Sequence, residues 1–273
     1  MLTFLSYRRP LCECRRLGFV FLLVLGYGEQ ALSRETIKAS LSSYASEGDY
    51  GFESKTFTLA TQAGIKYQND QWSFRFIQPY VYQDGPAEFA FLEQGETGEI
   101  FTVIEEEQQT RSGFADPSVS LSYRWPKKSR TGSWSISERW KIPRANETKG
   151  FSSGRHEHTV SISRSFRFQR WMLNGQLGRH FRQYGKNSDN RARNHMRIGG
   201  MYFLSARTGL GFSFYNKAAT ENQEEDVRSL NVDMKIRLDR QWQLGVGAGK
   251  GLSSSASDQY LGLNLSYRWK LKN

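Results

Sequence analysis

A two-residue alternation of apolar and polar side chains runs through this chain and limits the folds open to it. From Val119 to Trp125 the odd positions are Val, Leu, Tyr and Trp, whereas the even positions are Ser or Arg. Successive side chains of a strand point to opposite faces, so the pattern predicts a strand with one apolar and one polar face. Gly113, Asp116 and Pro117 predict a turn just before it.

The same period recurs along the rest of the chain, with no helical period competing. Twelve segments carry it, at 36–44, 55–67, 71–82, 118–125, 132–142, 156–168, 170–182, 192–204, 206–217, 226–239, 241–251 and 259–271. The connections after the even segments are short, and those after the odd ones are longer and polar. Short turns at one rim and long loops at the other are typical of outer-membrane barrels. We therefore predict an all-β fold, a transmembrane antiparallel up-and-down β-barrel of about 12 strands over residues 34–273.

The aromatic residues favour lipid over a soluble core as the partner of the apolar face. They make up 14% of a chain whose mean hydropathy is −0.64. Five tryptophans lie near the short-turn ends of five segments, which predicts an interfacial girdle: Trp72, Trp125, Trp171, Trp242 and Trp269. The alternative is a soluble sandwich with tryptophans in its core. Glu138 shares the apolar row of Trp134 and Ile136, so either a bulge resets that row or Glu138 lies near an interface.

Residues 1–33 have the pattern of a secretory signal peptide. Four arginines precede the apolar run Leu17–Leu25, and Ala31-Leu32-Ser33 offers a cleavage site. The alternative, an anchor helix, needs a run of roughly 20 residues. Both cysteines precede the run, so a mature chain has no disulfide, cysteine metal site or catalytic thiol. We expect the outer membrane of a Gram-negative cell, with lipid, lipopolysaccharide and the barrel-assembly machinery as partners.

The predicted lumen is rich in cations. The net charge is +11, and removing four Arg and two Glu with residues 1–33 leaves +9. Acids on the inward rows are few, chiefly Asp233 and Asp258, so an open lumen would favour anions. Alternatively, the cations fill a narrow lumen and pair with loop carboxylates, giving a plugged structural barrel. Nucleic acid is not expected as a partner. The inward cations are Lys38, Lys66, Arg75, Arg139, Lys141, Arg167, Arg182, Arg193, Arg197, Arg207, Lys235, Arg237 and Arg268.

The longest predicted loop, residues 83–111, is rich in glutamate. Its apolar content suggests a folded segment that dips into the lumen as a constriction. The alternative is a solvated acidic hairpin that binds divalent ions bridging lipopolysaccharide. The carboxylates proposed for the constriction are Glu88, Glu93, Glu105, Glu106 and Glu107.

Other candidate chemistry is weak. The glycines of 245–251 lack the spacing of a phosphate-binding loop, and alternate glycines in a strand instead clear lumen space. His156, His158 and Ser161 raise the possibility of an outer-membrane hydrolase. Nucleophile and base must meet, however, and Ser161 and His158 lie on opposite faces. We therefore expect no enzyme, no metal site and no cofactor.

Several short stretches, in order, resemble a known family. They are Gly48–Gly51, Tyr67 with Trp72, Pro79-Tyr80, Gly85-Pro86, Gly113–Tyr123, Lys141–Pro143 and Tyr267–Trp269. The family is a group of bacterial outer-membrane "transporter" barrels related to MetA-like proteins of phenol meta-cleavage pathways. The resemblance implies a single barrel of the twelve-strand type and uptake of small molecules, without catalytic residues. The resulting hypothesis is a porin-like channel or transporter that admits or binds small polar solutes, anionic or aromatic acids.

Overall fold

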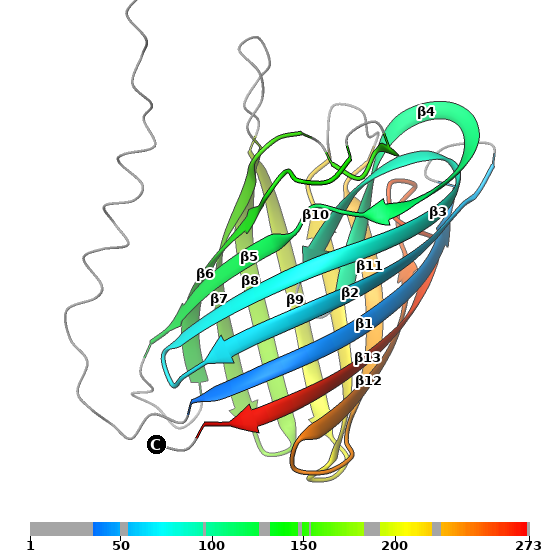
Figure 1. Ribbon diagram of the computed structural model, residues 1–273. Helices are drawn as coiled ribbons and strands as arrows, with labels where there is room; N and C mark the ends of the chain where they lie inside the picture. Colours follow the sequence, from blue (N-terminus) through cyan, green and yellow to red (C-terminus); the bar gives the residue numbers. More distant parts are fainter. Residues whose placement is uncertain are drawn as a thin grey trace, which may run out of the picture. The chain divides into compact units, whose positions relative to one another are not determined.

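Backbone pairing joins all the strands of the computed structural model into one antiparallel sheet (Figure 1). The strands are β1 (Thr36–Gly48), β2 (Thr56–Gln68), β3 (Trp72–Gln94), β4 (Thr97–Phe114), β5 (Ser118–Arg124), β6 (Gly132–Lys141), β7 (Glu157–Phe168), β8 (Trp171–Arg182), β9 (Arg193–Phe203), β10 (Thr208–Lys217), β11 (Val227–Arg237), β12 (Trp242–Gly251) and β13 (Gln259–Lys270). The structure describes residues 35–49, 54–94, 97–125, 132–146, 149–152, 154–182, 192–219 and 225–271, and only the backbone of 86–108 and 182. The predicted signal segment, 1–33, lies outside them and stays a prediction.

The sheet closes on itself as a 12-strand barrel. β1 pairs with β13 on one side and β2 on the other, and β2 pairs in turn with β3. β4 adds no separate strand to the barrel, because it lies in line with β5 along the same edge of β3. Tyr80 pairs with Phe114 of β4, and Ile77 pairs with Ser118 of β5. The predicted fold class is confirmed.

The alternation of connection lengths is confirmed as well. Short connections join β2 to β3, β5 to β6, β7 to β8, β9 to β10 and β11 to β12, and β1 begins at the rim where β13 ends. In three of these turns a side chain accepts two backbone N–H groups, the geometry favoured by Asn, Asp and Ser. These residues are Asn69, Ser205 and Asp239. The two N–H donors lower the pKa of the Asp239 carboxyl. We call this end the inner rim and the long-loop end the outer rim.

The two faces of the wall differ as the alternation requires. On β2, Thr56, Thr58 and Ala60 are buried inside, whereas Leu59 is 40% and Ile65 58% exposed on the outside. The polar row therefore lines the lumen, and the exposed apolar row faces lipid. No helix among the described residues is long and apolar enough to cross a membrane.

Aromatic pairs repeat around the inner rim on the outer face. In each pair a tryptophan packs on the tyrosine directly across the strand ladder. The ring centroids of Trp72 and Tyr123 lie 4.8 Å apart, and those of Trp242 and Tyr267 lie 4.9 Å apart. Trp171 and Tyr202 repeat the contact at 4.9 Å. Amphipathic rings at one level suit the membrane interface, as predicted for the girdle.

Glu138 faces outward without a bulge, because β6 keeps an unbroken register with both neighbours. It lies three residues before the outer end of β6, so of the two alternatives the structure supports the position near an interface. Its Oε1 atom is 3.9 Å from Nδ1 of His158.

The segment predicted as a long loop is instead a β-hairpin. β3 and β4 pair from Gln94–Thr97 down to Tyr80–Phe114, with a register shift between Gly85 and Ala87. Gly85 takes a φ of 143°, which glycine adopts readily. β2 accompanies β3 only up to Asp84, so the hairpin extends past its barrel neighbour. The predicted constriction stays a prediction, because its side chains lie outside the described ones: Glu88, Glu93, Glu105, Glu106 and Glu107.

The assignment of side chains to the lipid-facing or the lumen-facing side of the wall can be tested by placing an arginine on each side. Val232→Arg, at the centre of β11 and 53% exposed outside, should destabilise the barrel by about 2–4 kcal/mol, the cost of Arg at the bilayer midplane. Gly247→Arg places the side chain in the lumen beside Asp233 and should cost much less. Urea titration in lipid vesicles measures both, and equal losses would contradict the assigned faces.

Candidate functional site

The cations predicted for the lumen lie on several strands and in one turn. Arg75 is on β3, Arg139 and Lys141 on β6, Arg193 and Arg197 on β9, Lys235 and Arg237 on β11, and Arg268 on β13. Arg207 lies exposed in the β9–β10 turn, and its backbone oxygen accepts from Arg237 N at 2.7 Å. Arg182 closes β8, and its side chain is outside the described ones.

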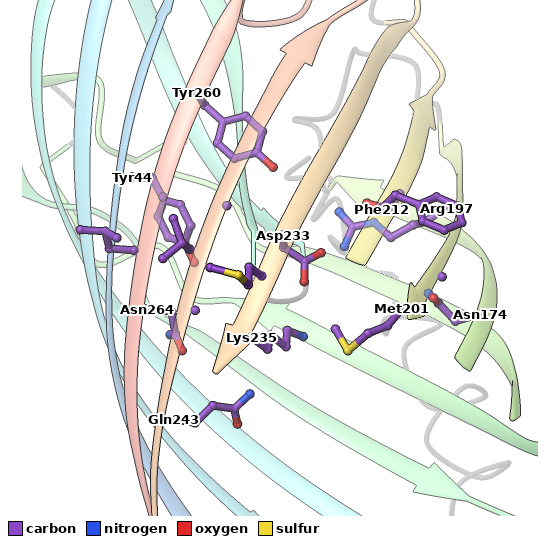
Figure 2. Close-up of a pocket in the computed structure, with 18 of the residues that line it drawn as sticks. Tyr44, Asn174, Arg197, Met201, Phe212, Asp233, Lys235, Gln243, Tyr260 and Asn264 are labelled. Carbon is purple, nitrogen blue, oxygen red and sulfur yellow. The ribbon is translucent and has the colours of Figure 1, made fainter. Parts of the chain in front are cut away.

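A cavity of about 360 Å³ lies in the lumen wall at mid-depth (Figure 2). Figure 2 shows Asp233 and Lys235 of β11 between two groups of side chains. Tyr44, Tyr260, Gln243 and Asn264 are on one side, and Arg197, Met201 and Asn174 are on the other. The cavity therefore combines two cations, one carboxylate, amides and apolar surface. Both of these cations, Arg197 and Lys235, were predicted to line the lumen.

Glycines make part of the floor of this cavity. β12 places Gly245 and Gly247 inward, and a Cβ at these positions would meet its nearest heavy atom at 3.4 and 3.7 Å. Other inward glycines are covered by side chains instead: the ring of Tyr44 lies over Gly262, and the carboxylate of Asp233 over Gly211. The glycine-rich run of β12 therefore clears space, as its sequence predicted.

Two groups in the cavity are held in place by neighbours. The guanidinium of Arg197 lies 5.4 Å from the ring centroid of Tyr215, which is fully buried. Asn264 Nδ2 donates to Ser42 Oγ at 2.5 Å. A cation stacked on a buried ring is oriented before any solute arrives, which reduces the entropy cost of binding.

A second cluster lies towards the outer rim and centres on Asp116, which interrupts the edge between β4 and β5. Its Oδ1 atom accepts from the backbone N–H groups of Arg144 and Ala145, both at 2.9 Å. Its Oδ2 atom accepts from Ser152 Oγ at 2.8 Å and lies 3.7 Å from Lys141 Nζ. One buried carboxylate thus holds both ends of the β6–β7 connection. We call its described residues, 142–146 and 149–152, the latch segment.

The latch segment places an aromatic ring inside the barrel. Phe151 is 4% exposed and packs with Ala60, Val81 and Ala115, which lie on the lumen side of β2, β3 and the β4–β5 junction. Gly113 leaves room for the ring, because a Cβ there would approach it to 3.1 Å. The outer part of the lumen is therefore occupied by a folded segment of the chain.

Lys141 joins the latch to a buried charged network. Its Nζ lies 3.3 Å from Glu157 Oε1, and Glu157 Oε2 lies 3.5 Å from His180 Nε2. The other ring nitrogen of His180 is 2.9 Å from Thr159 Oγ1. These side chains are all buried, and the Lys141 ammonium and the Glu157 carboxylate compensate each other's charge.

Sequence reasoning missed several of these residues. Asp116 and Glu157 were absent from the expected inward acids, and Phe151 from the lumen residues. Two further buried cations were also missed: Arg111 of β4 and Lys217 of β10. For Glu157 and Lys217 the signal was present, since each shares parity with an inward residue of its strand. For Asp116 and Phe151 no local signal exists, because their contacts join residues 28 to 91 positions apart in the sequence.

The histidine expected as a possible catalytic base is not the one that meets Ser161. His195 Nε2 lies 3.3 Å from Ser161 Oγ, with both side chains buried. A catalytic Ser–His pair needs a third group to orient the base, and His195 Nδ1 has no hydrogen-bond partner in the described part of the chain. No three potential metal ligands come together among the described residues.

A closed antiparallel barrel with a lipid-facing apolar belt, an aromatic inner rim and a charged lumen defines an outer-membrane β-barrel protein. The family model described as "Putative MetA-pathway of phenol degradation" matches residues 35–269. The chain belongs to this family, as the resemblance of its motifs suggested.

Solved structures share the fold at low identity. The COG4313 outer membrane channel of Pseudomonas putida F1 superposes with a TM-score of 0.65 at 12% identity, over 88% of this chain and 97% of that one. The KdgM porin gives a TM-score of 0.50 at 10% identity, over 84% and 98%. No curated protein matches the sequence.

The latch can be tested by removing its carboxylate. Asp116→Ala deletes three hydrogen bonds, each worth about 0.5–1.5 kcal/mol, so the latch segment should leave the lumen. We expect higher single-channel conductance in a planar bilayer and new tryptic cleavage after Arg144 from the outside. Asp239→Ala is the matched control, because it deletes two similar backbone contacts in an inner-rim turn. Unchanged conductance in the Asp116 variant would show that the latch segment does not close the lumen.

Proposed function

We propose that this protein is an outer-membrane channel that admits small anionic organic solutes, aromatic acids among them, and binds them in the mid-lumen cavity. The observation that carries the proposal is the pairing of Arg197 and Lys235 with an open glycine floor in one cavity. A water-filled pore lined with cations lowers the entry barrier for anions.

The cavity offers distinct surfaces to the two halves of an aromatic acid. The carboxylate of the solute would accept from the guanidinium of Arg197 or the ammonium of Lys235. Its ring would lie over Gly245 and Gly247, where no side chain fills the space. Asp233 supplies an acceptor, which suits a hydroxyl or N–H group on the same solute.

The size of the cavity agrees with this class of solute. A volume of about 360 Å³ is at the lower end of the range for small-molecule sites. Its wall is formed by β1 and β8–β13. The Phe151 cluster lies on β2, β3 and the β4–β5 junction, none of which lines the cavity, so cavity and latch occupy different parts of the lumen wall.

The plugged-barrel alternative is favoured by one observation, the burial of Phe151 inside the outer part of the lumen. The latch segment is held by the Asp116 carboxylate, by the packing of Phe151 and by single hydrogen bonds from Ile142 N to Pro117 O and from Lys149 Nζ to Ser112 O, whereas the barrel wall is joined by continuous ladders. We therefore propose that it forms the closed state of the outer mouth. Assembly by the barrel-assembly machinery and contact with lipopolysaccharide stay predictions. No enzymatic activity is proposed.

Ion selectivity tests the proposed function. In a planar bilayer with a salt gradient, the wild type should select anions. Arg197→Gln with Lys235→Gln should reduce the anion-to-cation permeability ratio, by roughly two- to fivefold per charge if each acts as an exposed ion pair. The control is Arg164→Gln with Arg179→Gln, which removes two cations from the outer face, where they stack on Phe166 and Phe181. A cation-selective wild type would contradict the proposal.

Filling the floor of the cavity tests where the solute binds. Gly247→Leu should shorten the dwell time of benzoate, measured as blocking of the chloride current, because the leucine side chain occupies the space for the ring. Gly175→Leu adds the same side chain on the lipid face, where no atom lies within 4 Å, and should leave the block unchanged. Equal blocking in both variants would place the binding site elsewhere.

A further inference from the structure

Arg164 is a cation on the lipid-facing side of the barrel wall. It belongs to the outward row of β7, between Ile162 and Phe166, which are 43% and 40% exposed. Its guanidinium lies 4.2 Å from the ring centroid of Phe166 and 4.8 Å from that of Trp134, its partner across the β6–β7 ladder. No carboxylate in the described part of the chain forms an ion pair with it. Two rings therefore hold the cation, and its N–H donors remain available to an acceptor from the membrane.

The guanidinium of Arg164 is directed towards the inner rim. Arg164 lies four residues before the inner end of β7, which is about 10 Å along the membrane normal for a tilted strand. Phe166 is two residues nearer that rim, and Trp134 is the third residue of β6, which begins there. A long cationic side chain can keep its stem in hydrocarbon while its charge reaches the headgroups. The charge therefore approaches the lipid phosphates on the short-turn side, which is the periplasmic side of an outer-membrane barrel.

Open apolar surface lies directly beside this cation. Gly175 of β8 is the cross-strand neighbour of Arg164, and no atom lies within 4 Å of a Cβ built there. Exposed apolar side chains border the glycine on the same face: Leu173 and Leu177 on β8 and Ile198 on β9, which are 45%, 59% and 55% exposed. An acyl chain can lie over Gly175 against these side chains, with its headgroup towards the inner rim.

The inner rim near Arg164 is positively charged. Arg124 ends β5 and Arg170 lies in the β7–β8 turn, and both are exposed. The acids among the described residues of this rim lie at other strands: Glu35 before β1, Asp70 in the β2–β3 turn and Asp239 in the β11–β12 turn. A local excess of cations favours an anionic headgroup over a zwitterionic one.

A second copy of the chain suits this surface less well than a lipid does. Copies in one membrane share their orientation, so the carboxylate of a partner would have to lie at the depth of Arg164. The acids at described lipid-facing positions of the strands lie towards the outer rim instead: Glu47, Asp84 and Glu138.

We infer that Arg164, Trp134, Phe166 and Gly175 form a binding site for an anionic phospholipid of the inner leaflet. The headgroup phosphate accepts from the guanidinium of Arg164, and one acyl chain lies over Gly175. The site is on the lipid side of the wall, and none of its four residues lines the mid-lumen cavity. The inference rests on the outer-membrane barrel, and it does not depend on which solute the channel admits.

Photo-crosslinking in vesicles tests the site. The intact channel is placed in phosphatidylcholine vesicles with a trace of phosphatidylglycerol or phosphatidylcholine that carries a photoactivatable acyl chain. Trypsin then releases the peptide Trp171–Arg179, which contains Gly175, and the β12 peptide Gln241–Lys250 as a reference. In the wild type, the ratio of phosphatidylglycerol to phosphatidylcholine labelling should be higher in the first peptide. Arg164→Gln should lower this ratio by about two- to fivefold, the effect of one exposed ion pair.

The matched control is Arg207→Gln, which removes an exposed cation from another inner-rim turn. A loss confined to the Arg164 variant supports the site, and its unchanged labelling by phosphatidylcholine shows that the barrel is inserted. Equal ratios in the two wild-type peptides, or an equal loss in the Arg207 variant, would overturn the inference. Dimers that disappear in the Arg164 variant during sedimentation would place a second copy there and would overturn it as well. A cation-selective wild type would reject the proposed function and leave these outcomes unaffected.

Discussion

Every backbone N–H and C=O group that faces hydrocarbon needs a partner within the chain, and this constraint shapes the whole structure. An isolated unpaired group costs several kcal/mol in the bilayer core. The ladder from Thr36 to Glu47 against β13 removes the last free edge by joining the two ends of the sheet. Pro79 and Pro117 lack a donor, and they lie where β3 passes from β5 to β4. There the Gln78 side chain donates to the carbonyl oxygen of Ala115 at 2.9 Å.

Closure also explains why the lumen can be highly charged. Once all backbone groups are paired in the wall, the inward side chains need only satisfy one another, water or a solute. Asp116 shows how this works without a regular element: it collects backbone donors of the latch segment and the ammonium of Lys141 in one buried site. Deleting one member of such a group leaves an uncompensated buried charge. The resulting loss of stability is larger than the stability that the intact group contributes.

The sequence predicted the wall better than its contents. All twelve barrel strands follow from the two-residue period, because lipid outside and water inside impose it on every strand. The strands of the β3–β4 hairpin were not predicted. Residues 83–111 were expected to be a loop dipping into the lumen, with an acidic hairpin as the alternative, since their glutamates resemble a solvated connection and β2 does not extend to the tip. Arg197 and Lys235 were predicted to face the lumen from their positions in the two-residue alternation. That both line the same cavity depends on the register between the strands. The latch segment depends on contacts between distant parts of the chain, which a period cannot show.

The two clusters of charge give the lumen a polarity from rim to rim. Near the outer rim, the ammonium of Lys141 lies within 3.7 Å of the carboxylates of Asp116 and Glu157, so its charge is largely balanced. Near the inner rim, Arg268, Lys38, Lys66 and Arg75 occupy paired register positions on four successive strands. Cations on neighbouring strands contribute to a positive potential at this end of the lumen, because a low-dielectric wall focuses their field. An anion that passes the latch would meet these cations at the inner rim, and its release would depend on competing ions there, because electrostatic potentials decay over about 8–10 Å at physiological salt.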